Sequence, residues 1–247
     1  MIRLIRLGEP TEQPPLFAIP GMDGTIGSVQ PVVSQLAERR EVIVVDYSTE
    51  SHATLEALSA EIAALIKAEG HAVIDVLGQS IGTVIAAQIA SEFGLPVRKV
   101  ALCCTFTHLR WNMLRLLAAF LRMTPRWLYR LTSPTATLLM CGPVGDGRKH
   151  PAFDAALDTD AAAIARRTSW EIDRDFAADL VKIIQPLLIL MGDRDRFVPN
   201  IGRELEKLRV IFVNHPAHIE TIPNAGHIFL PSTAIMLASE KIDAFLE

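Results

Sequence analysis

The sequence of 247 residues contains few cysteines and has no strong excess of one charge. Its three cysteines, Cys103, Cys104 and Cys141, form an odd set without the spacing of a metal or redox motif. They predict free buried thiols in a reducing compartment rather than a disulfide framework. The formal net charge of −4 gives no overall case for nucleic-acid binding.

Long apolar runs are also absent. The N-terminal stretch MIRLIRLGEPTEQPP lacks the apolar core of a signal peptide, and no run reaches the roughly 18 apolar residues of a membrane span. We therefore expect a cytoplasmic protein with no transmembrane segment. Half of the residues are hydrophobic and the mean hydropathy is +0.28, which indicates a globular chain with a large core.

Short apolar strand patterns alternate with helix patterns along most of the chain. Strands are expected at residues 2–7, 16–19, 42–45, 73–77, 97–104, 186–191 and 217–222. Helices are expected at residues 29–39, 53–69 and 233–245, and after Gly82. This order predicts an α/β fold with a mostly parallel, doubly wound sheet.

The alternation stops between residues 105 and 185, where helical patterns predominate. They occur at 111–123, in a short stretch from Pro125, at 155–167 and at 172–184, with a Gly- and Pro-rich loop at 141–151. About eighty residues are too many for an ordinary crossover connection. We expect a helical cap insertion at 105–185 over the active site, and a core made of residues 1–104 and 186–247.

The expected cap is locally basic. Between Thr105 and His150 it has seven Arg or Lys residues and one acidic residue, Asp146. A basic, apolar cap could attract an anionic substrate, an acyl carrier or an acidic membrane surface. The alternative is a solvated basic face on helices that pack against the core.

Residues 73–90, VIDVLGQSIGTVIAAQIA, combine a β-branched run, a glycine-rich turn and an apolar helix pattern. Ser80 stands at the apex of the turn, where a strained backbone would expose its hydroxyl and the next helix would direct its first amides at an oxyanion. Gly78 and Gly82 avoid side-chain collisions on either side. The G-x-S-x-G pattern alone arises by chance in roughly one chain of this length in ten, so its strand–turn–helix context carries the prediction. The alternative is a helix-capping serine in an ordinary turn.

A second glycine-rich loop, Pro-Gly-Met-Asp-Gly-Thr at residues 20–25, follows an early strand. Taken alone, this sequence predicts a plain turn. Beside Ser80 it favours an oxyanion loop, with the backbone N–H groups of Met22 and Ile81 as donors and Gly21 as a supporting residue.

Candidate partners for Ser80 follow two late strands. Asp193 and Asp195 come after the strand at 186–191, at the sheet edge that faces the binding crevice, and either could orient a histidine. His227 comes after the strand at 217–222, in the run Pro-Asn-Ala-Gly-His.

These motifs resemble the α/β-hydrolase family over almost the whole chain. The order Ser80, acid, His227 is that family's order, and the G-x-x-D-x-x-V-P run at 192–199 is similar to its acid loop. The resemblance implies the α/β-hydrolase fold and a catalytic triad of Ser80, Asp195 and His227, with Asp195 preferred to Asp193. It also implies that no metal or cofactor is required, and that Gly78, Gln79 and Gly82 support the nucleophile.

Three positions depart from the family pattern. Gln79 stands where many members have His, Ile19-Pro20 where many have an apolar residue and His, and Thr83 where a second glycine is common. The triad is complete, but a particular subfamily is not indicated.

The resemblance implies a serine hydrolase that cleaves carboxylic esters through an acyl-enzyme on Ser80. An acyl thioesterase or acyltransferase acting on CoA- or carrier-bound acyl groups would use the same intermediate. Hydrolysis of a C–C bond or an amide is a further alternative, because the triad does not specify the leaving group. A non-catalytic binding or receptor protein on the same fold belongs to a different class.

Overall fold

The computed structural model describes residues 1–109, 112–142, 159–171, 174–198 and 200–247. The side chains of residues 112–114, 117, 126, 134 and 136–141 are likewise outside the described set. The strands are β1 (Arg3–Leu7), β2 (Leu16–Ile19), β3 (Val42–Asp46), β4 (Ile74–Gln79), β5 (Val97–Cys103), β6 (Leu187–Gly192) and β7 (Ala217–Ile222).

These strands form one seven-stranded sheet in the order β1-β3-β2-β4-β5-β6-β7. Only the β1–β3 pairing is antiparallel, and the other neighbours are parallel. Successive side chains of β2 point to opposite faces, so Phe17 and Ile19 enter one hydrophobic cluster while Leu16 and Ala18 enter another. The structure therefore confirms the predicted α/β class and the mostly parallel sheet.

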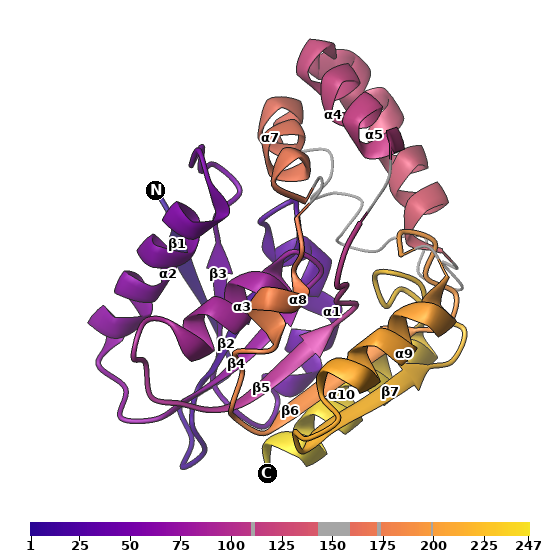
Figure 1. Cartoon of the computed structure of the whole chain (residues 1–247). Coiled ribbons are helices and arrows are strands. Elements are labelled where there is room, and N and C mark those ends of the chain that lie inside the picture. Colours follow the sequence, from indigo (N-terminus) through magenta and orange to yellow (C-terminus); the bar gives the residue numbers. More distant parts are fainter. Residues whose placement is uncertain (110–111, 143–158, 172–173, 199) are drawn as a thin grey trace.

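Helices cover both faces of the sheet (Figure 1). Their bounds are α1 (Ile26–Leu36), α2 (Leu55–Glu69), α3 (Gly82–Ser91), α4 (Asn112–Met123), α5 (Arg126–Cys141), α7 (Ala161–Glu171), α8 (Ala177–Leu180), α9 (Ile201–Ile211) and α10 (Ser232–Leu246). One cluster packs α2, α3, α8 and α9 against the sheet, and the other packs α1 and α10. This two-sided cover confirms the doubly wound arrangement.

Two helices of the core differ from the prediction. Helix α1 begins three residues early, because the Thr25 hydroxyl accepts a hydrogen bond from the Gly27 N–H and caps it. Helix α9 was not predicted at all. The Asn200 side chain caps it by accepting from the Arg203 N–H, and Leu205 and Leu208 bury its inner face.

Between β5 and β6 the chain forms α4, α5, α7 and α8. Helix α5 has 16 residues, so the expectation of a short helix there was wrong. Helix α8 covers four residues of the stretch predicted at 172–184, and residues 172–173 lie outside the described set. The predicted loop from residue 143 onward and the predicted helix at 155–158 also lie outside it.

Helices α4, α5 and α7, which we name the outer helices, stand at one end of the molecule beyond the sheet and its flanking layers (Figure 1). Leu121 of α4, Tyr129 of α5, and Ala161 and Ala165 of α7 form a small hydrophobic cluster of their own. Helix α8 returns to the core and packs beside α3. No helix in the described part of the chain has both the length and the apolar composition needed to cross a membrane.

Candidate active site

Ser80 occupies the turn between β4 and α3 with a backbone φ of 54°. This left-handed conformation is unfavourable for a residue with a side chain. Neighbouring groups hold it in place. The Ser80 N–H donates to the Cys103 carbonyl oxygen at 3.0 Å, and the Thr83 hydroxyl donates to the Ser80 carbonyl oxygen at 2.6 Å. The sequence prediction did not assign this role to Thr83.

The two glycines that flank Ser80 allow very close backbone contacts. A Cβ added at Gly82 would lie 2.3 Å from the Pro20 carbonyl oxygen, and one at Gly78 would lie 2.5 Å from the Gly82 carbonyl oxygen. Both distances are too short for any side chain. The turn therefore keeps its shape only with glycine at these two positions.

His227 joins Ser80 to Asp195 in one hydrogen-bonded chain. The His227 Nε2 lies 2.7 Å from Ser80 Oγ, and Nδ1 lies 2.7 Å from Asp195 Oδ2. An ionised carboxylate only accepts hydrogen bonds, so Nδ1 carries the proton and Nε2 is left to accept from the serine hydroxyl. All three side chains are buried. The structure thus brings together the three residues predicted from widely separated motifs.

Asp195 is fixed by its own loop. Its second oxygen, Oδ1, accepts hydrogen bonds from the Phe197 N–H at 2.7 Å and the Val198 N–H at 3.0 Å. These bonds hold the carboxylate in a fixed orientation beside the imidazole. Asp193, the other candidate acid, is exposed, and no described hydrogen bond joins its side chain to His227.

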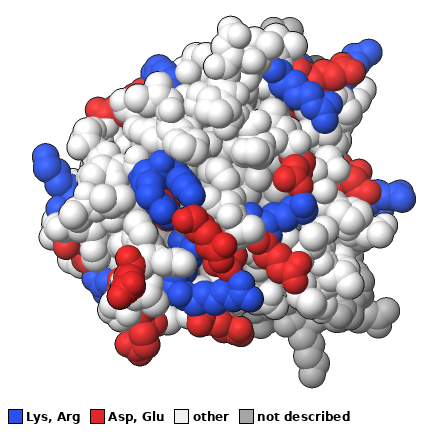
Figure 2. Space-filling view, turned by 90° about the horizontal axis from the view of Figure 1, so that it is seen from below, with Lys and Arg blue, Asp and Glu red and all other residues white. Residues whose placement is uncertain are grey.

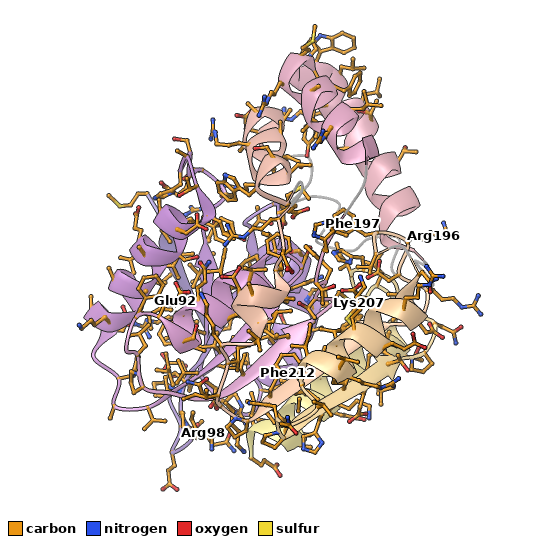
Figure 3. The ribbon with its side chains drawn as sticks, viewed as in Figure 1. Glu92, Arg98, Arg196, Phe197, Lys207 and Phe212 are labelled. Atoms are coloured by element: carbon orange, nitrogen blue, oxygen red, sulfur yellow. The ribbon has the colours of Figure 1, made fainter. Side chains whose placement is uncertain are left out.

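Three further side chains contact His227 or the residue before it. Gln79 donates from Nε2 to the His227 carbonyl oxygen at 2.9 Å, which gives a physical role to the residue that departs from the family pattern. The centroids of the Phe197 ring and the imidazole are 4.5 Å apart. Phe197 lies at the upper edge of the core, below the outer helices (Figure 3). The Cys104 thiol lies 3.6 Å from the Gly226 carbonyl oxygen. The sequence gives no local signal for the last two contacts.

The early glycine-rich loop lies directly against Ser80. A Cβ added at Gly21 would stand 3.3 Å from Ser80 Cβ. The Tyr47 hydroxyl lies within 2.7 Å of the Pro20 and Gly21 carbonyl oxygens and can donate to either. The backbone N–H groups of Met22 and Ile81 donate to no acceptor within the described residues. Both are thus available as oxyanion donors.

Arg167 of α7 connects the outer helices to this loop, a role that the sequence does not reveal. Its guanidinium is almost fully buried and stacks over the Tyr47 ring at 5.0 Å. It donates to five carbonyl oxygens, those of Met22 (2.9 Å), Asp23 (2.9 Å), Tyr47 (2.6 Å), Ser48 (3.1 Å) and Glu50 (3.2 Å). Burial lowers the pKa of Arg167 from its usual range, but a guanidinium keeps its charge in proteins.

Two clusters of side chains place potential metal ligands close together. The potential ligand atoms of Cys104, Asp195 and His227 lie within 4.8 Å of one another, as do those of a partly exposed cluster at Glu50, His52 and Glu61. In the first cluster each carboxylate oxygen, each ring nitrogen and the thiol already has a hydrogen-bond partner. This arrangement suits proton transfer better than metal binding.

Comparison with known proteins points to one family. Residues 14–232 match the family model described as the alpha/beta hydrolase fold. No curated protein matches the sequence.

Among solved structures, an enol-lactonase from Burkholderia xenovorans LB400 is similar at a TM-score of 0.80 and 19% identity, covering 99% of this chain and 96% of its own. A thermophilic esterase from Thermogutta terrifontis has a TM-score of 0.77 and 18% identity, with coverages of 99% and 92%. A bromoperoxidase from Bacillus anthracis has a TM-score of 0.80 and 17% identity, with coverages of 99% and 95%. The family match spans most of the sequence and agrees with the sheet order and its flanking helices. The chain therefore belongs to the alpha/beta hydrolase fold family.

Proposed function

We propose that this chain is a serine hydrolase that cleaves carboxylic esters through an acyl-enzyme on Ser80. The observation that carries the proposal is the continuous hydrogen-bonded chain from the Ser80 hydroxyl through His227 to Asp195. The similar esterase and enol-lactonase structures support ester cleavage as the reaction class, since a lactone is a cyclic ester.

The contacts suggest a role for each group. His227 Nε2 takes the Ser80 proton as Oγ attacks the ester carbonyl, and the resulting imidazolium is stabilised by Asp195. The oxyanion would accept from the Met22 and Ile81 amides. His227 then gives its proton to the leaving alkoxide, which departs as the alcohol. In the second half, His227 deprotonates a water that attacks the acyl-enzyme, and the acid leaves as Ser80 regains its proton.

We further propose that residues 1–104 and 186–247 form the hydrolase core and that 105–185 form a cap. The outer helices stand beyond the sheet, and Arg167 reaches from α7 to the loop beside Ser80. A cap in this position would line the acyl or alcohol pocket and limit access of water.

The test is turnover of p-nitrophenyl esters from acetate to palmitate by the wild type and Ser80→Ala. The matched control is Ser91→Ala, at the far end of α3, where the hydroxyl donates to the Ala87 carbonyl oxygen of the same helix. Loss of turnover in Ser80→Ala but not in Ser91→Ala would support the proposal, and the best chain length would size the pocket.

The negative outcomes also separate the alternatives. If no ester is turned over but a fluorophosphonate labels Ser80, the same acyl-enzyme chemistry would be assigned to thioesters or acyl transfer. If Ser80 is neither labelled nor needed, the hydrolase proposal fails and a binding protein on this fold is favoured.

A further inference from the structure

Five large apolar side chains are exposed on α4 and α5. They are Leu116 (70% exposed), Phe120 (57%), Met123 (85%), Trp127 (68%) and Leu131 (71%). The three on α4 recur at i, i+4 and i+7 and the two on α5 at i and i+4, so each set occupies a single side of its helix. We name these five residues the apolar outer face.

The opposite sides of both helices are buried. Ala118 and Leu121 of α4 and Tyr129 and Ser133 of α5 are all buried, and α4 packs along α7. The apolar outer face therefore points away from the rest of the protein, at the end of the molecule formed by the outer helices (Figure 1). Within the described residues, nothing covers it. Single exposed apolar residues need no explanation, but a row of large ones along one side of a helix is typical of an interaction surface.

Arginines accompany this face. Arg115 and Arg122 of α4 and Arg130 of α5 are exposed, and the first two are seven residues apart and thus lie on one flank of α4. The sequence has no Asp or Glu between Thr105 and Gly145. The opposite end of the molecule differs, because there Lys and Arg are interspersed with Asp and Glu (Figure 2). Positive charge beside an apolar surface is therefore a local property of α4 and α5.

We propose that α4 and α5 dock on the surface of an anionic lipid bilayer. The apolar outer face would enter the boundary between headgroups and acyl chains, and the flanking Arg122 would contact lipid phosphates. A bilayer fits better than a protein partner, because the bulky side chains protrude from the outer sides of two helices. A single partner surface would need matching depressions for all of them, whereas fluid lipid needs none. This inference goes beyond ester hydrolysis and does not depend on it.

Co-sedimentation of the full chain with vesicles tests the proposal. The vesicles are phosphatidylcholine alone or phosphatidylcholine mixed with phosphatidylglycerol. We expect binding to the mixed vesicles, weakened about tenfold or more by the double substitution Phe120→Ser and Trp127→Ser. The matched control is Val210→Ser with Val213→Ser, two similarly exposed apolar side chains elsewhere (72% and 74%), which should bind like the wild type. Circular dichroism and melting temperature check that both double variants fold.

The charge contribution has its own variant. Arg122→Gln should weaken binding to phosphatidylglycerol-containing vesicles by about fivefold at low salt and leave binding to phosphatidylcholine unchanged. Arg209→Gln, an exposed arginine of α9, is the control.

Two results would overturn the proposal. One is the absence of binding to anionic vesicles, or binding that the Phe120 and Trp127 substitutions leave intact. The other is a wild-type dimer in sedimentation velocity that the same two substitutions convert to monomer without any vesicle binding, which would make this face an interface between copies of the chain.

Discussion

At the residue scale, the proposed chemistry requires a carboxylate held in place next to His227. Asp195 meets this need through two backbone N–H donors, whereas Asp193 is exposed to solvent. We expect Asp195→Asn to lower kcat by about a thousandfold or more, because an amide would favour the wrong imidazole tautomer. Asp193→Asn should change kcat by less than about twofold. Ester hydrolysis rates decide between them, and the reverse pattern would reassign the acid.

Glu171, at the end of α7, is a single residue that should lower the folding stability. It is completely buried, and neither carboxyl oxygen has a hydrogen-bond partner among the described residues. Burial raises its pKa to about 8. In the unfolded chain the same group titrates near 4.5. Between these two pH values the unfolded state binds fewer protons than the folded state, so folding stability falls as pH rises from about 4.5 to about 8.

We therefore expect Glu171→Gln to be more stable than the wild type at pH 8, by about 4 kcal/mol, and equally stable below pH 4.5. Tyr47 is the titratable group that interacts with Glu171, and burial keeps its pKa above the usual range, so it stays neutral across this window. Melting temperatures of both proteins measured from pH 4 to pH 9 test this. If the melting temperatures of the two proteins change with pH in the same way, the Glu171 carboxyl is not the cause of the pH dependence.

At the scale of elements, α7 is tied to the glycine-rich loop at residues 20–25 by two neighbouring side chains: Arg167, and Thr168, whose hydroxyl lies 3.0 Å from the Met22 sulfur. Replacing Arg167 with Met leaves the Met22 and Asp23 carbonyl groups without their donors, so the loop should lose its fixed position beside Ser80. We expect kcat to fall about tenfold to a hundredfold with little change in KM, because the loop would act mainly on the transition state.

The neighbouring Arg166→Met is the control, since its side chain makes none of these contacts. Assays are run well below the melting temperature of each variant, and fluorophosphonate labelling rates of Ser80 give a second readout. If Arg167→Met lowers only the melting temperature, while kcat and the labelling rate stay at wild-type levels, then Arg167 has a structural role alone.

Elements with a strong local pattern were predictable from the sequence. The β2 and β7 strands match the predicted bounds, because each is a short apolar or alternating run closed by turn residues. The prediction missed helix α9, although Ile201, Leu205 and Leu208 recur at helical spacing among its many charged residues. The Asn200 cap fixes its start.

The candidate site also contains residues that the sequence predicts and contacts that it does not. Ser80, Asp195 and His227 stand in recognisable loops, so their motifs could be read directly. The contacts of Thr83, Arg167 and Gln79 join residues through the folded structure, and no local pattern encodes such distances.

At the scale of the whole molecule, a buried ion network joins the helix and sheet layers. Asp75 of β4 is fully buried and accepts from Arg98 of β5 at 3.0 and 2.7 Å, and it lies 3.4 Å from buried Arg40. Arg40 also approaches Asp243 of α10 at 3.5 Å. Asp75→Asn should lower the free energy of unfolding by about 3 kcal/mol, because it leaves a buried charge without its partner.

The control for this prediction is an exposed ion pair. Glu92→Gln removes the partner of Lys182, 2.6 Å away at the surface, and should cost less than about 0.5 kcal/mol. Glu92 and Arg98 are both marked in Figure 3. Urea unfolding compares the two variants, and equal losses would show that burial of the Asp75 network adds nothing.

The sheet order has a consequence for the time at which chemistry can begin. The first 103 residues supply β1 to β5 with Ser80 and both proposed oxyanion donors. Asp195 and His227 come only after β6 and β7, which join along the β5–β6 pairing. During synthesis, the serine leaves the ribosome long before its acid and base. If the proposed mechanism holds, a nascent chain would remain inert toward acyl groups until β6 has paired with β5 and β7 with β6.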